Sequence, residues 1–242
     1  MQMNAPVKGI FFDIGWTLLR PASGDFFVNT KMLECIDTKT FAAIPQDKKT
    51  AAFDQALKYL DDHHLVLSED EELKQFEVFY SMLADGLPEL ALTKEQTRKI
   101  AHSKVYDMDN YIFFDDTAAT LEALHGKYKL GVISDTWPSI ERMLRHGNIE
   151  HFFDAKTYSC FLGTWKPDKR MYLHALEQMK LPPEQTLFID DGENNLDGAA
   201  MLGIQPVQII ARPNERSSGK YPCINKPSEL LDILPYEYGG NI

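Results

Sequence analysis

Short apolar runs alternate with helical patterns near the start of the chain and throughout its second half. Five runs predict buried strands, at residues 7–13, 129–134, 152–157, 186–190 and 206–210. Between the later runs, apolar residues recur at helical spacing, as Ile140 and Leu144 do. This alternation predicts an α/β fold, with a Rossmann-like, mostly parallel sheet covered by helices on both faces.

The stretch between the first and second strands has a different pattern. Residues 20–109 contain amphipathic helices and no convincing strand: within 53–60 the apolar positions follow i, i+3, i+4, i+7 spacing, and a capping box at 68–71 marks a helix start. We therefore expect an all-helical cap domain, 20–109, inserted into an α/β core domain made of 1–19 and 110–242.

The overall composition limits the class of partner. The 242 residues carry a net charge of −11, which disfavours nucleic acid or an anionic membrane as the main partner. No apolar run reaches the roughly 18 residues of a membrane span, and the N-terminus lacks an apolar signal core. Three widely spaced cysteines fit a reducing compartment. We expect a cytoplasmic protein, monomeric or homodimeric, that binds a small molecule.

Polar residues with possible chemistry gather where the predicted strands end. Ligands of open parallel sheets bind beyond the carboxyl ends of the strands. The groups at such positions are Asp13, Ser134 with Asp135, Lys166 in the loop after the third strand, and Asp190 with Asp191. Singly, each is more often a turn former, a helix cap or a surface residue than a catalyst. Their joint occurrence makes a catalytic site the better interpretation.

These residues form four ordered motifs. The first is Asp13-Ile14-Gly15-Trp16-Thr17, the second is Ser134 after its strand, the third is Lys166-Pro167 preceded by Gly163, and the fourth is Asp190-Asp191 followed by two asparagines. In this the chain resembles the haloacid dehalogenase-like (HAD) hydrolases, whose first motif is commonly Asp-x-Asp-x-Thr. The insert resembles the helical cap of the family's dehalogenase and phosphatase branch.

The resemblance implies a phosphatase mechanism with three catalytic residues. Asp13 would attack phosphorus and form an aspartyl-phosphate, which divides a difficult hydrolysis into two steps. Ser134 would hydrogen-bond the phosphoryl group. Lys166 would neutralise the charges of the phosphate and of the Asp13 carboxylate. The leading interpretation is a hydrolase of phosphomonoesters or acyl phosphates that acts on a small phosphorylated metabolite.

The resemblance also implies a Mg²⁺ site. Asp13 and Asp191 would bind the ion through side-chain oxygens, the Gly15 carbonyl would be another ligand, and Asp190 would be a ligand or a partner of one. Hard oxygen ligands suit Mg²⁺. Three carboxylates that meet without a cation would repel one another and raise each other's pKa. Mg²⁺ and Lys166 would remove this repulsion, so a cluster of carboxylates and these two cations are expected to occur together.

Gly15 departs from the family pattern. It stands where the family has a second aspartate, which protonates the leaving oxygen and then activates water. General acid–base catalysis contributes about 10²–10⁴-fold, so we expect activity to favour substrates with good leaving groups. Asp135 is a candidate replacement acid, and a helix cap near Pro138 is an equally good interpretation of that residue.

Several residues near the motifs could bind substrate. The candidates are Thr17, Arg20, Asp135 and Trp16. The tryptophans that flank the motifs either pack at the rim between core and insert or form an aromatic wall that selects a flat or apolar substrate. The insert could act as a lid hinged near 18–24 and 108–114.

Two other functions stay open. A non-catalytic or weakly active phosphate-binding or regulatory protein would explain Gly15, although the other motif residues argue for an enzyme. A haloacid dehalogenase, in which Asp13 would attack carbon, is less favoured. That chemistry needs no metal, whereas the paired Asp190 and Asp191 suggest one.

Overall fold

The computed structural model describes residues 6–234, which divide into two compact units. The first unit comprises the chain up to Arg20, Phe113–Asp135, and the chain from Leu144 onward. The second comprises Pro21–Ile112 and Thr136–Met143. Residues 1–5 and 235–242, which we assigned to the core domain, lie outside the described residues.

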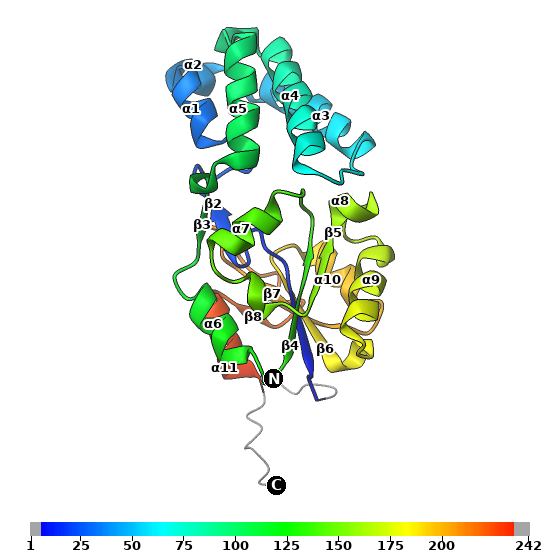
Figure 1. Cartoon of the computed structure of the whole chain (residues 1–242). Helices are drawn as coiled ribbons and strands as arrows, with labels where there is room; N and C mark the ends of the chain where they lie inside the picture. The colour runs from blue at the N-terminus through cyan, green and yellow to red at the C-terminus, as the bar shows by residue number, and fades with distance from the viewer. Residues whose placement is uncertain (1–5, 235–242) are drawn as a thin grey trace. The chain divides into compact units, whose positions relative to one another are not determined.

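The first unit is built on a six-stranded sheet in which neighbouring strands run parallel (Figure 1). The strand order is β5-β4-β1-β6-β7-β8. The bounds are β1 Gly9–Phe12, β4 Lys129–Ser134, β5 Ala155–Tyr158, β6 Thr186–Asp190, β7 Gln205–Ile209 and β8 Cys223–Ile224. The α/β prediction and its five strands are confirmed, each strand within a few residues. The two-residue β8 was not predicted.

Helices lie on both sides of this sheet, as Figure 1 shows for α9 and α6. The helices of the unit are α6 Thr117–Leu124, α7 Ile140–His146, which begins in the second unit, α8 Ser159–Leu162, α9 Lys169–Met179, α10 Glu193–Ala200 and α11 Leu230–Ile233. Phe11 and Phe188 sit opposite each other on β1 and β6 and pack with apolar residues of α9 and α10. Strands buried on both faces explain the continuous apolar runs in the sequence.

Close packing at the centre of the sheet requires a glycine. Gly131 on β4 pairs with Phe11 on β1. A Cβ at position 131 would lie 2.8 Å from the Phe11 ring and 2.9 Å from Met179. The missing side chain therefore allows the Phe11 ring and α9 to approach the sheet, which fixes the β1 strand that ends at Phe12, directly before Asp13.

The second unit is helical. Its helices are α1 Thr30–Cys35, α2 Thr38–Ala43, α3 Gln46–Asp62, α4 Glu69–Gly86 and α5 Lys94–Tyr106. The 53–60 pattern lies within α3, and the Ser68 hydroxyl caps α4 by accepting the Glu71 N–H at 3.3 Å. Short 3₁₀ turns in the two units are η1 Pro88–Leu90, η2 Met108–Asn110, η3 Glu150–Phe152, η4 Pro183–Gln185 and η5 Pro227–Glu229.

The segment Thr136–Met143 packs against α4 within the second unit. The Trp137 indole N–H donates to Gln75 Oε1 at 2.6 Å. The Glu72 carboxylate accepts the Ser139 N–H at 2.8 Å and the Ser139 hydroxyl at 2.7 Å. Burial nevertheless raises the pKa of Glu72 to about 7. Trp137 is thus a buried packing residue with a hydrogen-bonded indole.

Two short strands lie where the insert leaves and rejoins the core sequence. β2 (Leu19–Pro21) and β3 (Tyr111–Phe113) pair as a separate two-stranded sheet. Neither was predicted, because three residues are too few to show an apolar alternation. Both fall within the segments that we expected to act as hinges, and the hinge role stays a prediction.

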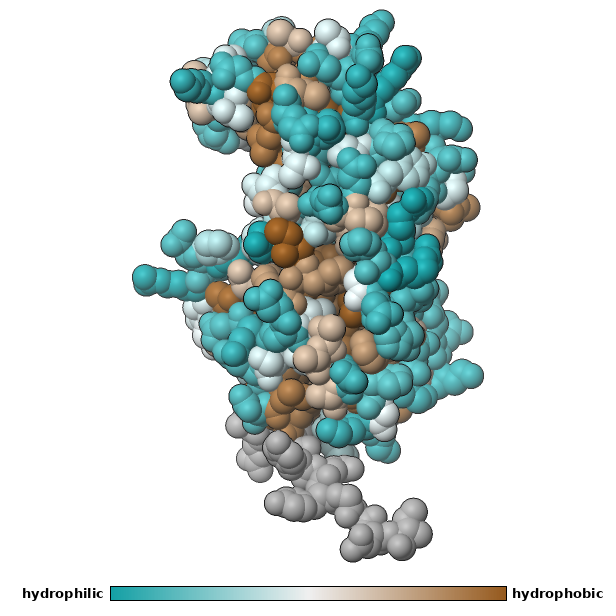
Figure 2. Space-filling view, turned by 60° about the vertical axis from the view of Figure 1, so that its left-hand side comes forward, coloured by the Kyte–Doolittle hydropathy of each residue, from teal (hydrophilic) through white to brown (hydrophobic). Residues whose placement is uncertain are grey.

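Hydrophilic residues cover most of the face shown in Figure 2, with smaller apolar areas between them. Among residues 6–234, no helix is both long and apolar enough to cross a membrane.

Candidate active site

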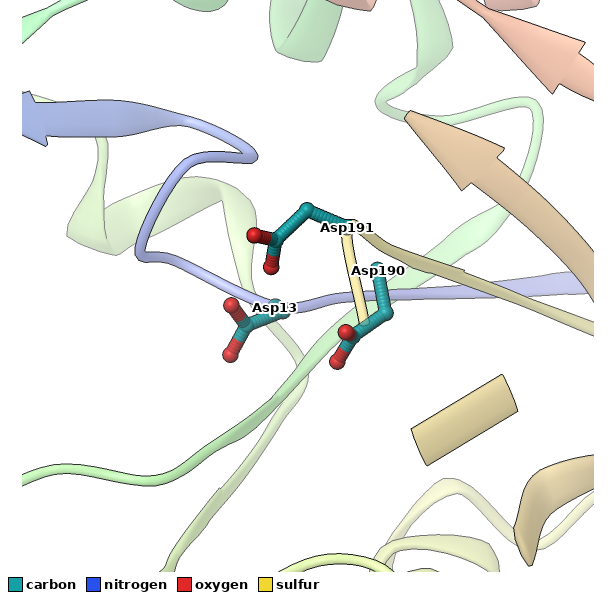
Figure 3. Close-up of side chains that lie close together, drawn as sticks. All are labelled: Asp13, Asp190 and Asp191. Carbon is teal, nitrogen blue, oxygen red and sulfur yellow. The ribbon is translucent and has the colours of Figure 1, made fainter. Parts of the chain in front are cut away.

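Two neighbouring strands bring three aspartates together at one edge of the sheet (Figure 3). Phe12, the last residue of β1, pairs with Ile189 on β6, and the Asp13 N–H donates to the Ile189 carbonyl at 2.9 Å. Asp190 is the last residue of β6, and Asp191 follows it. The parallel register therefore places the three side chains side by side, as expected from their positions at strand ends.

The three carboxylates are buried and close enough to share a cation. One oxygen from each of Asp13, Asp190 and Asp191 lies within 4.8 Å of the others. The residues are 6%, 0% and 9% exposed. An all-oxygen, acidic donor set of this kind suits a hard divalent cation such as Mg²⁺. The residues present thus fit the metal that the sequence motifs imply.

Lys166 supplies a positive charge inside this cluster. Its ammonium donates to Asp13 Oδ1 and to Asp190 Oδ2, both at 2.7 Å, and to the Ile133 carbonyl at 3.3 Å. Its side chain is 1% exposed. Burial lowers the pKa of Lys166, but the surrounding carboxylates raise it further, to well above the usual value. The side chain therefore stays protonated.

Asp190 receives hydrogen bonds on both carboxylate oxygens. Oδ1 accepts the Gly192 N–H at 2.7 Å and the Asn195 side-chain amide at 3.0 Å. Oδ2 accepts Lys166 at 2.7 Å and the Asn195 amide at 3.2 Å. Burial, with Asp13 and Asp191 nearby, still raises the pKa of Asp190. The Asp190 side chain thus ties Lys166 to the start of α10.

Ser134 and Asp135 lie beside the cluster at the end of β4. Ser134 is the last residue of that strand and is 2% exposed. Asp135 Oδ1 accepts the backbone N–H of Lys166 at 2.9 Å, which fixes the lysine loop to β4. Burial raises the pKa of Asp135 to about 6. At pH 7 about one molecule in ten therefore carries a proton on this carboxyl group, and the fraction grows as the pH falls toward 6.

The first motif continues as a tight turn. The Trp16 N–H donates to the Leu19 carbonyl at 2.7 Å, and Trp16 adopts a left-handed φ of 56°. Thr17 is 1% exposed, and within the described part of the chain its hydroxyl oxygen has no hydrogen-bond partner. Arg20 lies further on, half-buried in β2. Gly15, without a side chain, forms a bridge with Leu19.

Sequence reasoning missed one residue of the site, Arg212. Its Nε and Nη2 atoms both contact Asp191 Oδ2, at 2.7 and 2.6 Å. Its guanidinium carbon lies 5.4 Å from the centre of the Trp16 ring. Burial raises the pKa of Asp191 to about 6, and Arg212 works against that rise. Because Arg212 follows the strand predicted at 206–210, the same strand-end rule could have found it.

The motifs can now be compared with known proteins. A model of the haloacid dehalogenase-like hydrolases matches residues 7–203. The chain belongs to this family. The buried aspartates and Lys166 come from three of the four motifs on which the resemblance was based. The family assignment, the α/β fold and a hydrolase are thus supported together.

Curated relatives cover the chain to different extents. The chain is 29% identical over 126 residues to the GMP/IMP nucleotidase YrfG of Escherichia coli (strain K12), a match that covers 50% of this chain and 57% of that protein. It is 27% identical over 241 residues to a glyceraldehyde 3-phosphate phosphatase of Methanocaldococcus jannaschii, covering 94% and 97% of the two chains. The chain thus spans little more than half the length of the first relative.

Solved structures agree on the fold. A dehalogenase crystal structure superimposes with a TM-score of 0.68 at 19% identity, covering 96% of this chain and 99% of that one. At this identity the likeness concerns the fold alone. The choice between phosphorus and carbon chemistry must therefore come from the site residues.

Proposed function

We propose that this protein is a Mg²⁺-dependent phosphatase that hydrolyses a phosphomonoester or acyl phosphate of a small metabolite. The observation that carries the proposal is the group of three buried carboxylates, with oxygens within 4.8 Å of one another. A dehalogenase needs one nucleophilic carboxylate and no metal, so this cluster favours phosphoryl transfer. The relatives named for nucleotide and triose phosphate substrates support a small phosphorylated compound.

Asp13 is the proposed nucleophile. Its carboxylate would attack phosphorus and form an aspartyl-phosphate, which water then hydrolyses. Lys166, 2.7 Å from Asp13 Oδ1, holds this carboxylate in place and offsets negative charge as the phosphate approaches. Ser134, at the adjacent strand end, would donate its hydroxyl to a phosphoryl oxygen.

The metal ligands would be Asp13, Asp191 and the carbonyl of Gly15. Asp190, already the acceptor of hydrogen bonds from Lys166, Gly192 and Asn195, would complete or support this set. A bound Mg²⁺ would offset the charge of the carboxylates and of the incoming phosphate.

Substrate contacts are proposed for residues of the first turn. The buried Thr17 hydroxyl has no partner within residues 6–234, so a phosphoryl oxygen would satisfy it. Trp16 is 8% exposed and would contribute at most a ring edge. Arg20 would add an anion contact from the connecting segment. We further propose a cytoplasmic protein, a monomer or a homodimer, whose partner is this small substrate.

Gly15 lacks the side chain that donates a proton to the leaving group in the family. This absence affects which substrates we expect to react. Substrates whose leaving group needs little protonation should react best. Asp135, with its pKa raised to about 6 by burial, could supply a proton. The second candidate function, a phosphate-binding protein with little or no turnover, rests on Gly15 alone.

A hydrolysis assay separates these functions. p-Nitrophenyl phosphate, phenyl phosphate and an alkyl phosphate are incubated with wild type, with and without Mg²⁺. Asp13→Asn is the test variant. The matched control is Asp197→Asn, because Asp197 lies on α10 and pairs with Lys220. We expect Mg²⁺-dependent turnover that is lost in Asp13→Asn and kept in Asp197→Asn. Phosphate binding without turnover of any ester would favour the binding protein, and dechlorination of 2-chloropropionate without Mg²⁺ would favour the dehalogenase.

A further inference from the structure

Arg212 is held beside the Asp191 carboxylate by two different contacts. Its Nε and Nη2 contact Asp191 Oδ2 at 2.7 and 2.6 Å, and its guanidinium carbon lies 5.4 Å from the Trp16 ring centre. Guanidinium groups stack on aromatic faces and pair with carboxylates in a fixed orientation. The two contacts together hold the charged group beside Asp191 and over the Trp16 ring.

Some N–H groups of Arg212 are not used in its contacts with Asp191. A guanidinium has five N–H donors. Among residues 6–234 its charge pairs are with Asp191 and, at 4.0 Å, with Glu215. The side chain is 49% exposed, so the remaining donors can reach a bound molecule.

Arg212 lies close to Gly15, the position at which the family's acidic side chain is missing. The Arg212 guanidinium lies over the ring of Trp16, the residue that directly follows Gly15. It also binds Asp191, whose oxygen lies within 4.8 Å of an Asp13 oxygen. The guanidinium therefore lies next to Asp191, a neighbour of the nucleophile, and beside the turn at Gly15, where the family's acidic side chain is absent.

We propose that Arg212 is a further catalytic residue, which stabilises the charge that develops on the leaving-group oxygen. This inference rests on the proposed phosphatase function. In the first step, a bond forms between an Asp13 oxygen and phosphorus, and the bond from phosphorus to the ester oxygen breaks. The electron pair of that bond stays on the leaving oxygen, which accepts an Arg212 N–H and takes its proton from water after release.

The dependence of rate on the leaving group tests this role. Arg212→Met removes the charge but keeps most of the side-chain length, and Arg212→Lys keeps the charge but not the planar fork. The matched control is Lys220→Met, since Lys220 also lies over an aromatic ring, Tyr221, and pairs with a carboxylate, Asp197. For each variant, kcat/KM is measured with p-nitrophenyl, phenyl and alkyl phosphates at a Mg²⁺ concentration shown to saturate that variant.

The expected result is a loss that grows with leaving-group pKa. Removing one donor to a developing oxyanion costs about 10²–10³-fold. We therefore expect Arg212→Met to lose about 10²-fold on the alkyl phosphate and little on p-nitrophenyl phosphate, with Arg212→Lys in between. Lys220→Met should lower all three rates equally or not at all. Guanidinium ion should partly rescue Arg212→Ala on the poor leaving groups.

Two results would overturn the inference while leaving the phosphatase function intact. The first is an equal loss on all three esters, with weaker Mg²⁺ binding in a titration without substrate, which would limit Arg212 to positioning Asp191. The second is a rise in KM with unchanged kcat, which would assign Arg212 to ground-state binding. If the wild type hydrolyses none of the esters, it is the proposed function itself that fails.

Discussion

Replacing Lys166 by methionine removes the positive charge from the centre of the carboxylate cluster. The ammonium makes two 2.7 Å contacts, to Asp13 and Asp190, and its side chain is 1% exposed. Methionine keeps most of the side-chain volume and its contact with the Phe188 ring, from which the ammonium lies 5.4 Å away. The substitution therefore tests charge compensation and largely preserves packing.

The size of the effect follows from burial. Removing one partner of a buried ion pair costs about 3–5 kcal/mol, because the other charge stays buried and unpaired. Here the carboxylates can take up protons instead, so we expect about 3 kcal/mol near pH 8 and well under half of that near pH 5. For a chain of this length that corresponds to a fall in thermal midpoint of about 6–12 °C near pH 8.

Thermal unfolding at these two pH values, in a chelator and then in Mg²⁺, measures the effect. Lys129→Met is the control, since Lys129 is exposed and its ammonium donates only to the Met179 carbonyl among the described residues, at 3.0 Å. Mg²⁺ should restore much of the lost stability of Lys166→Met by supplying the missing charge. An equal loss at both pH values, unchanged by Mg²⁺, would refute charge compensation and assign the loss to packing.

Three further predictions concern the wild type and the packing around the site. Burial raises the folded-state pKa of Asp191 to about 6, so metal-free protein should lose stability as pH rises from about 4 through 6, and Mg²⁺ should reverse the trend in thermal unfolding. Gly198→Ala would place a Cβ 2.8 Å from Pro167, costing about 1–3 kcal/mol in urea unfolding. Glu72→Ala should destabilise the helical unit by about 1–3 kcal/mol, and Glu72→Gln by less.

The sequence was sufficient to predict the sheet but not its shortest parts. Long apolar runs such as 186–190 predict strands buried on both faces, and β6 has the predicted bounds. β2, β3 and β8 have two or three residues each, too short for any periodicity. Nothing in the local pattern indicates that Thr136–Met143 packs with the helical unit, because the contacts of Trp137 and Ser139 are with residues more than 60 positions away.

The meeting of Asp13, Asp190 and Lys166 could be predicted because their motifs occupy the ends of strands and loops at one edge of a parallel sheet. Arg212 also follows a predicted strand, so the strand-end rule could have included it as a candidate, but its partners in the site are not visible in the sequence. Its role depends on the side chains of Trp16 and Asp191, which come from two other strand ends. Pairings of this kind require coordinates.

In the proposed mechanism Asp13 carries the phosphoryl group during turnover. The direct measurement is mass spectrometry of peptides from enzyme mixed with p-nitrophenyl phosphate and Mg²⁺ and quenched in acid within one turnover. We expect a phosphoryl group on the peptide that contains Asp13, bound to the Asp13 carboxylate and absent from Asp13→Asn. Full turnover with an unmodified Asp13, or a phosphoryl group on another residue, would contradict it.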